Sequence, residues 1–230
     1  NVNTIFWTVD VLSYLRSIGG NRTPCFLYGL IPSVCLTWLR FGKRVLLKVL
    51  NGKDFCRPTI PSADKIKEYS GMIEAKYPSL KNCWGAMDGL KVMLESTSDE
   101  STQSMFYNGY KCDHFITNLF LFTPDGKIAA SYFNAPGSIH DSTMAKMSGI
   151  YKKIDCVYQE TGGRVVADSA FQSHSSVPSL IGSKQRRINA QGLPTHASQT
   201  ARDATSVRQL SEWGMRGLQG SFPKLKDRIP

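Results

Sequence analysis

The chain has 230 residues, of which 41% are hydrophobic and 20% are charged. This length and composition fit one ordinary globular domain, or a domain with a small helical appendage, and they exclude a disordered or fibrous protein. Lys and Arg together number 28 against 18 Asp and Glu, which gives a net charge of +10. Such an excess predicts a polyanionic partner, although it would also serve simply to keep the protein in solution.

No stretch approaches the roughly 18 apolar residues that a membrane-spanning helix needs, because the N-terminal hydrophobic segment is broken at Asp10 and Arg16. We therefore expect a soluble protein with no membrane partner. The six cysteines are scattered, without a CxxC pair or a zinc-finger spacing, which favours reduced thiols. Because the chain starts at Asn1 inside a helical pattern, we expect a fragment or a processed product.

Residues 1–61 are predicted to form a small helical segment and a linker. The helical pattern breaks at Gly29 and starts again at Pro32, so two helices would be joined by a tight turn. Basic residues line one face of the second helix. They are Arg40, Lys43, Arg44 and Lys48. Two interpretations stay open, a helix-turn-helix whose second helix binds DNA and a bundle helix with a solvated cationic face.

Residues 62–230 are predicted to form one α/β domain. It begins with a helix that Ser62 caps and that ends before Pro78. Strands are predicted over 83–94, 114–122, 128–133 and 164–167, and further helices over 139–147 and from about 206. The turn sequence Pro124-Asp125-Gly126 would join the second and third strands into a hairpin, and Ser138 would cap the helix that follows them.

A polar stretch at about 173–206 shows neither a helical nor a strand period, and we expect it to be a mobile insertion. The remaining order is three strands, a helix, a fourth strand, the insertion and a helix. This order matches the front half of a ribonuclease-H-like mixed sheet with flanking helices.

Three acidic residues stand where such a sheet would bring them to one edge. Asp88 lies within the first strand, Asp168 ends the fourth and Glu212 lies within the last helix. Strands one and four are adjacent in this arrangement, so the two aspartates would stand side by side. Carboxylates this close repel one another unless cations neutralise them, and oxygen ligands suit Mg²⁺ or Mn²⁺. Two such ions about 4 Å apart can activate water and stabilise a displacement at phosphorus.

Two of the three acids also have a structural alternative. Asp88 precedes Gly89 and would serve as a turn residue. Glu212 has Arg208 four residues before it and Arg216 four residues after it, which is typical of a surface ladder of ion pairs. Asp203 lies near enough in the sequence to compete with Glu212 for the third position.

Six ordered motifs run along the chain from Trp84 onward. They are Gly85-Ala86-Met87-Asp88-Gly89, Tyr107-Asn108-Gly109-Tyr110-Lys111 with His114 and Asn118, Pro124-Asp125-Gly126, Pro136-Gly137-Ser138-Ile139-His140-Asp141, Val166-Ala167-Asp168-Ser169-Ala170-Phe171, and Glu212-Trp213-Gly214-Met215-Arg216. On these motifs the sequence resembles the DDE superfamily endonucleases of the PIF/Harbinger transposase type, including their domesticated relatives.

The resemblance implies a nuclease core that cuts DNA at transposon ends with Mg²⁺ or Mn²⁺, using two ions. Asp88, Asp168 and Glu212 would be the catalytic carboxylates and metal ligands. Asp141 matches a further acidic position, which implies an accessory ligand, with a helix-capping role as the alternative. Lys111 and His114 would contact DNA phosphate or orient a carboxylate, or else they form an exposed strand end.

The resemblance also implies the partners. Arg40, Lys43, Arg44 and Lys48 would contact the backbone of double-stranded DNA. An accessory DNA-binding protein, a homo-oligomer and a nuclear location are further expectations, and the Lys184–Arg187 cluster would serve as an import signal or as a basic loop over DNA. The alternative is a catalytically inactive, domesticated transposase-derived protein that acts as a DNA-binding or scaffold protein.

Overall fold

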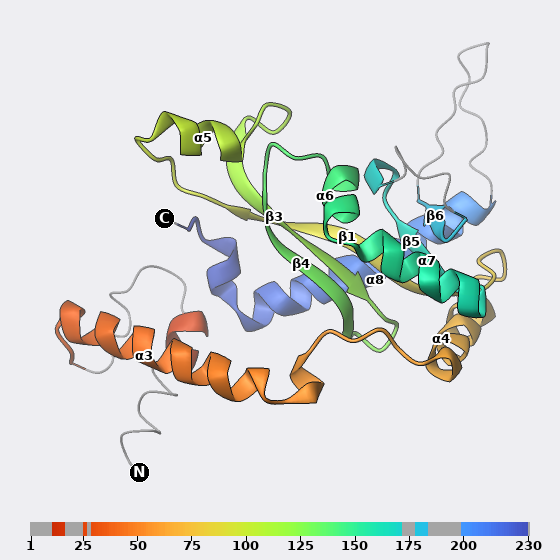
Figure 1. Cartoon of the computed structure of the whole chain (residues 1–230), viewed down its shortest axis with the longest axis horizontal. Helices are drawn as coiled ribbons and strands as arrows, with labels where there is room; N and C mark the ends of the chain where they lie inside the picture. The colour runs from red at the N-terminus through yellow and green to blue at the C-terminus, as the bar shows by residue number, and fades with distance from the viewer. Residues whose placement is uncertain (1–10, 17–24, 27–28, 172–177, 184–198, 230) are drawn as a thin grey trace. The chain divides into compact units, whose positions relative to one another are not determined.

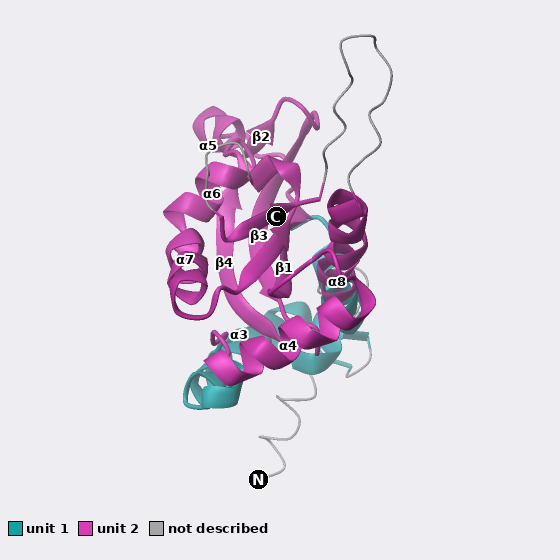
Figure 2. Cartoon of the chain, turned by 90° about the vertical axis from the view of Figure 1, so that its right-hand side faces the viewer, with its two compact units in different colours: residues 1–57, 216–230 teal, residues 58–215 magenta. Residues whose placement is uncertain are grey.

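The structure of the chain is a computed structural model, drawn in Figure 1. It describes residues 11–16, 25–26, 29–171, 178–183 and 199–229. The chain divides into two compact units, which Figure 2 shows in different colours. Unit 1 comprises residues 1–57 and 216–230, and unit 2 comprises residues 58–215.

Unit 1 is helical. Its main element is α3 (Pro32–Asn51), and the short helices η1 (Asp54–Cys56) and η3 (Pro223–Lys226) also belong to it. Gly29 has a φ of +61° just ahead of α3, so the expected helix break at this residue is confirmed. Proline at the first position starts α3, since the missing N–H of proline would have no helical partner there. A small core of Val11, Cys35 and Leu39 holds the unit together.

Unit 2 is built on a mixed sheet of six strands. The strands are β1 (Cys83–Met93), β2 (Tyr107–Asn108), β3 (Asp113–Phe122), β4 (Ile128–Pro136), β5 (Arg164–Ala167) and β6 (Leu180–Gly182). Their order is β2-β3-β1-β5-β6, with β4 also paired to β3. Strands β1, β3 and β4 pair antiparallel, whereas β5 pairs parallel to both β1 and β6. This topology confirms the predicted ribonuclease-H-like fold.

Helices cover both faces of this sheet. They are α4 (Ala63–Lys76), α5 (Glu100–Phe106), α6 (Asp141–Met147), α7 (Ile150–Thr161), the short η2 (Ser169–Phe171) and α8 (Gln199–Ser221). One core joins α6 and α7 to the sheet through residues such as Met144 and Ile154, and a second joins α8 through Ala204 and Val207. Figure 2 shows α6 and α7 on one side of the sheet and α8 on the other.

Most predicted elements are confirmed within two or three residues. The hairpin of β3 and β4 turns at Pro124-Asp125-Gly126, and Ser62 is the N-cap of α4. The predicted cap of α6 is wrong, because His140 holds the N-cap position while Ser138 donates its hydroxyl to the carbonyl of Met105. None of the described helices combines the length and the apolar character that crossing a membrane requires.

The stretch predicted as an insertion contains two elements that the sequence pattern did not indicate. Strand β6 extends the sheet at Leu180–Gly182, and α8 starts at Gln199, earlier than the predicted 206. Three residues are too few for a strand period, and hydrogen bonds to β5 stabilise this segment. The rest of the predicted insertion lies outside the described residues, as does the cluster Lys184–Arg187.

Candidate active site

Asp88 and Asp168 lie side by side because of the register between β1 and β5. Ala86 pairs with Val166 in this parallel pair, and both side chains belong to the core beneath α8. Asp88 and Asp168 lie two residues further along their chains, so both point to the same face of the sheet. Asp88 also pairs with Phe120 of β3, which makes the turn interpretation of Asp88 wrong.

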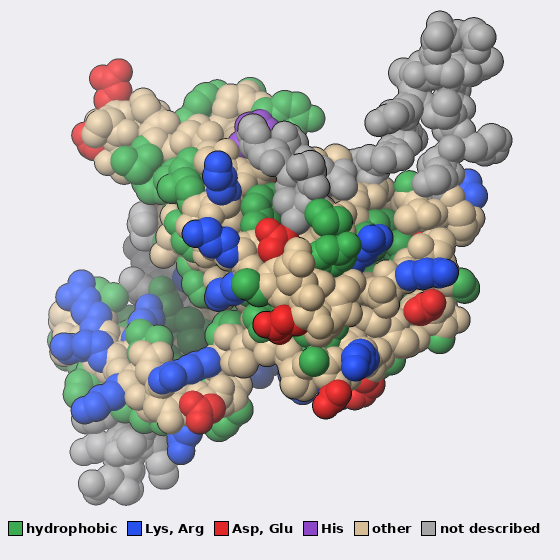
Figure 3. Space-filling view, turned by 45° about the vertical axis from the view of Figure 1, so that its right-hand side comes forward, with side chains coloured by type: hydrophobic (Ala, Val, Ile, Leu, Met, Phe, Trp, Pro, Cys, Tyr) green, Lys and Arg blue, Asp and Glu red, His purple; other side chains and the backbone are tan. Residues whose placement is uncertain are grey.

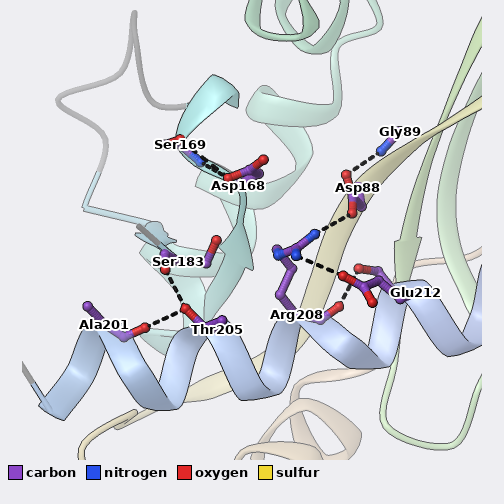
Figure 4. Close-up of polar contacts among 10 residues, drawn as sticks. Asp88, Gly89, Asp168, Ser169, Ser183, Ala201, Thr205, Arg208 and Glu212 are labelled. Atoms are coloured by element: carbon purple, nitrogen blue, oxygen red, sulfur yellow. Dashed lines mark hydrogen bonds and ion pairs between the residues drawn. The ribbon is translucent and has the colours of Figure 1, made fainter. Parts of the chain in front are cut away.

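Arg208 connects Asp88 to Glu212, as Figure 4 shows. Its Nη1 donates to Asp88 Oδ2 at 3.0 Å, and its Nη2 lies 2.7 Å from Glu212 Oε1. All three side chains are at least two-thirds buried, with exposed fractions of 21%, 18% and 32%. The i,i+4 pair expected on the last helix is therefore present, but it is part of a bridge to the sheet and is not a surface ladder.

Burial and neighbouring charge both act on the Asp88 carboxyl. Burial raises its pKa above the ordinary value, and so does the negative charge of Asp168, while the N–H of Gly89 and the guanidinium of Arg208 lower it in part. Asp168 in turn accepts hydrogen bonds from the N–H and the hydroxyl of Ser169, which fixes its orientation at the end of β5. The charge of Asp168 is thus close enough to destabilise the charged form of Asp88.

Asp141 lies at the first position of α6. Its Oδ1 is 4.0 Å from the point where a Cβ on Gly89 would sit. Burial raises the pKa of Asp141, the positive charges of Lys91 and His140 lower it, and the charge of Asp168 raises it again. Asp168 therefore acts electrostatically on both Asp88 and Asp141, so these three carboxylates form one acidic group.

A family model for DDE superfamily endonucleases matches residues 87–230, which is more than half of the chain and includes Asp88, Asp141, Asp168 and Glu212. The chain belongs to the DDE superfamily endonucleases. Neither a curated protein nor a solved structure matches it significantly.

DDE endonucleases generally use divalent metal ions, and the donor chemistry of this site fits such an ion. Its ligands are carboxylate oxygens, and the negative charge of Asp168, which raises the pKa values of Asp88 and Asp141, is what a divalent cation would offset. In the conformation described, however, no three His, Cys, Asp or Glu side chains of the described residues are arranged to hold a metal. The cationic guanidinium of Arg208 lies between Asp88 and Glu212 and pairs with both carboxylates.

Asp203, the acidic residue that competes with Glu212 for the third catalytic position of this endonuclease, makes contacts typical of a structural role. It is buried and accepts hydrogen bonds from Ser79 Oγ at 2.6 Å and from Gln199 Nε2 at 2.7 Å. These bonds tie the start of α8 to the loop after α4. Glu212 lies two and a half turns further along α8, and it is the acid that is linked to Asp88 on the sheet through Arg208.

Lys111 and His114, the residues expected to contact phosphate, lie around the turn between β2 and β3. The Lys111 side chain is exposed, with Nζ 5.5 Å from the centre of the Tyr110 ring. The His114 ring lies 5.1 Å from that of Tyr107, and its Nε2 is buried without a hydrogen-bond partner among the described residues. Lys111 is thus available to a ligand, whereas His114 packs into the strand end.

The basic residues predicted to contact DNA are exposed on α3, in unit 1. They are Arg40, Lys43, Arg44 and Lys48. Figure 3 shows Lys and Arg side chains gathered on this helix. Lys43 also lies over the ring of Tyr14, with Nζ 4.3 Å from its centre, and burial together with the charge of Lys224 lowers the pKa of Lys43.

Two residues of the site were not expected from the sequence. Arg208 was interpreted only as a partner of Glu212. Its bridge to Asp88 joins residues 120 positions apart, which a local sequence pattern does not indicate. Lys91 lowers the pKa of Asp141, and a lysine inside a strand with apolar neighbours is the signal that would have indicated a nearby carboxylate.

Proposed function

We propose that this DDE endonuclease is a divalent-metal-dependent enzyme that cuts DNA, a transposase of the PIF/Harbinger type that hydrolyses phosphodiester bonds at transposon ends. The observation that carries this proposal is the parallel pairing of β1 with β5, which sets Asp88 and Asp168 side by side on the face that α8 covers. Glu212 reaches the same place from α8 through Arg208.

In this proposal, Asp88, Asp168 and Glu212 hold Mg²⁺ or Mn²⁺, as two ions, and Asp141 supplies a further oxygen ligand. Bound ions of this kind lower the pKa of an attacking water and offset the charge that develops on the phosphate. Water or a 3′-hydroxyl attacks the phosphorus, and the bond to the 3′ oxygen breaks, so that the strand is left with a 3′-hydroxyl. The carboxylates position the reacting groups, since they come from rigid elements of the sheet and of α8.

The substrate in this proposal is double-stranded DNA, bound in part by the basic face of α3. Four exposed positive charges on one helix would each neutralise a phosphate and release a counterion. An accessory DNA-binding protein, assembly into a homo-oligomer and a nuclear location complete the proposal, and each follows from the resemblance to transposases of this type.

Cleavage of labelled duplex DNA in Mg²⁺ or Mn²⁺ tests the proposal directly. The chain is compared with Asp168→Asn, which removes one carboxylate charge, and with Asp64→Asn, an exposed aspartate of α4 that serves as the matched control. We expect nicking that depends on the metal, that Asp64→Asn retains and that Asp168→Asn abolishes. If the folded chain binds the same DNA in a salt-dependent way but does not nick it, the proposed nuclease activity is refuted. The alternative, a DNA-binding scaffold protein, would then hold.

A further inference from the structure

A cavity of about 360 Å³ lies beside Asp141 in unit 2. Its walls come from β1, from the turn between β2 and β3 and from the start of α6. The side chains that matter for binding are Lys91, Asn108, Tyr110, Lys111, His140 and Asp141. This volume falls within the range of about 300–1,000 Å³ that small-molecule sites occupy.

The rim of the cavity combines an open aromatic ring with positive charge. The side chain of Tyr110 is 89% exposed, although its ring is a large apolar surface. Lys111 Nζ lies 5.5 Å from the centre of this ring, and Lys91 Nζ lies 4.9 Å from the centre of the Phe115 ring. An exposed ring beside one ammonium group, with a second ammonium group in the lining of the same cavity, suits a nucleic-acid base together with its phosphates.

The floor of the cavity is held in place before any ligand arrives. Asn108 Nδ2 donates to the carbonyl of Gly137 at 2.6 Å, and Ser138 Oγ donates to the carbonyl of Met105 at 2.7 Å. Gly137 cannot be replaced without moving this floor, because a Cβ there would lie 2.7 Å from the carbonyl oxygen of Phe106. Bonds between segments about 30 positions apart thus fix the shape of the cavity.

Asp141, one of the carboxylates of the candidate active site, lines the cavity. A ligand in the cavity is therefore next to the place where the phosphodiester bond would break. Its phosphates would lie toward Lys91 and Lys111, since the carboxylate repels them.

We propose that this cavity binds one unpaired nucleotide of the DNA strand that is cut, with its base against Tyr110 and its phosphates at Lys91 and Lys111. The inference rests on the proposed function, because a nucleotide next to Asp141 has a role only if the acidic group acts on DNA. It goes beyond that function by requiring a strand that is locally open, so duplex ends with an unpaired tail bind more tightly than blunt ends.

Binding of two labelled duplexes to the full chain in EDTA tests this inference. One duplex is blunt, and the other carries an unpaired tail with the fluorescent base 2-aminopurine. Tyr110→Ala removes the ring and Tyr110→Phe keeps it. Because Tyr110 is exposed, both variants are expected to fold, and equal melting temperatures confirm this. Because a base stacked on an aromatic side chain adds to affinity, Tyr110→Ala is expected to weaken binding of the tailed duplex by about tenfold.

Tyr110→Phe is expected to retain the wild-type affinity and the quenching of 2-aminopurine, and the blunt duplex is expected to bind all three proteins alike. Equal affinity of wild type and Tyr110→Ala for the tailed duplex would overturn the inference, as would an equal loss for both duplexes. Cleavage in Mg²⁺ is measured separately. If the DNA is cleaved but Tyr110→Ala binds the tailed duplex as the wild type does, nucleotide binding in the cavity is refuted and the nuclease activity is not. If binding of the tail depends on Tyr110 but no cleavage occurs, the nuclease activity is refuted and nucleotide binding in the cavity is not.

Discussion

Arg208 of α8 donates a hydrogen bond from Nη1 to Oδ2 of Asp88 on β1, over 3.0 Å and across 120 positions of the sequence. The same guanidinium pairs with Glu212 at 2.7 Å. It therefore offsets the repulsion among the acidic side chains at the point where the proposed mechanism needs a metal ion. The Nε of Arg208 is buried and has no hydrogen-bond partner among the described residues, so the bridge leaves one donor of this side chain unsatisfied.

Replacement of this internal cation is expected to destabilise the metal-free protein. Arg208→Met leaves Asp88 and Glu212 without their counter-charge, and loss of one partner of a buried pair costs about 3–5 kcal/mol. Because the three side chains are still 18–32% exposed, we expect a smaller loss, about 2 kcal/mol in the free energy of unfolding by urea in EDTA. Mg²⁺ is expected to restore more stability to Arg208→Met than it adds to the wild type.

Arg202→Met is the matched control for this experiment, since Arg202 lies on the same helix and its exposed side chain donates a hydrogen bond to Gln199. Its free energy of unfolding is expected to change by less than about 0.5 kcal/mol. If Arg208→Met were as stable as Arg202→Met in EDTA, the bridge would not offset the acidic charge.

The basic face of α3 is expected to control DNA affinity. The triple variant Arg40→Gln, Arg44→Gln and Lys48→Gln removes three exposed charges. Each lost phosphate contact lowers the slope of log affinity against log salt by about 0.9, so we expect a slope smaller by about 2 to 3. Fluorescence anisotropy of a labelled duplex across a salt series measures it.

A second triple variant removes the same charge from exposed positions of unit 2, namely Lys67→Gln, Lys152→Gln and Lys153→Gln. We expect this control to retain most of the wild-type slope. Equal slopes for the two triple variants would mean that net charge alone, and no particular face of the chain, attracts DNA.

Gly214 is expected to be the residue that lets α8 lie against β3. A Cβ at this position would overlap the ring of Phe122, with Cζ at 2.7 Å and Cε1 closer still. Gly214→Ala gains about 1 kcal/mol of helix propensity but forces a clash with a buried ring, which costs about 1–3 kcal/mol or more. We expect a net loss of stability in thermal unfolding, together with slower DNA cleavage, because Glu212 is only two residues away.

Gly217→Ala tests the same helix without the clash, since nothing lies within 4 Å of a Cβ there. This variant is expected to gain about 0.5–1 kcal/mol. A stable Gly214→Ala protein, equal to Gly217→Ala in melting temperature, would contradict the close approach of α8.

Asp125, in the turn between β3 and β4, is expected to contribute stability that disappears in acid. Burial raises its pKa, but hydrogen bonds from Thr123, Lys127 and Tyr69 outweigh this, and the pKa lies well below the ordinary value of about 3.9. The unfolded chain therefore takes up a proton at a higher pH than the folded chain does. The contribution is complete above about pH 5 and is lost as the pH falls through 3.9 and below.

Urea unfolding of wild type and Asp125→Asn at pH 7 and pH 3 checks this dependence. Asp125 accepts from Tyr69 OH at 2.8 Å and pairs with Lys127 at 2.9 Å, so we expect Asp125→Asn to lose about 1–2 kcal/mol at pH 7. At pH 3 the difference between the two proteins is expected to shrink. A difference that stays constant would mean that packing, and not the charge of Asp125, stabilises the turn.

Local patterns of the sequence determined the four longer strands of the sheet, β1, β3, β4 and β5, and the family of the chain. Short apolar strands bounded by Pro124-Asp125-Gly126 predicted the hairpin, because turn chemistry and strand period are properties of neighbouring residues. Asp168, directly after the apolar strand Arg164–Ala167, indicated a functional acid, because this too is a pattern of neighbouring residues. Helix α7 was not predicted, although Ile150, Ile154 and Val157 recur with a helical period. The sequence therefore contained the signal for this helix.

Only the tertiary structure decided what surrounds these acids. The bridge from Arg208 to Asp88 depends on the register of β1 with β5 and on the approach of α8. The cavity at Asp141 depends on hydrogen bonds between segments about 30 positions apart. Sequence periodicity reports the face on which a residue lies but not the residue that packs opposite it. That partner is chosen when distant elements bury their apolar faces together, and for this reason the acids were predictable while the cation between them was not.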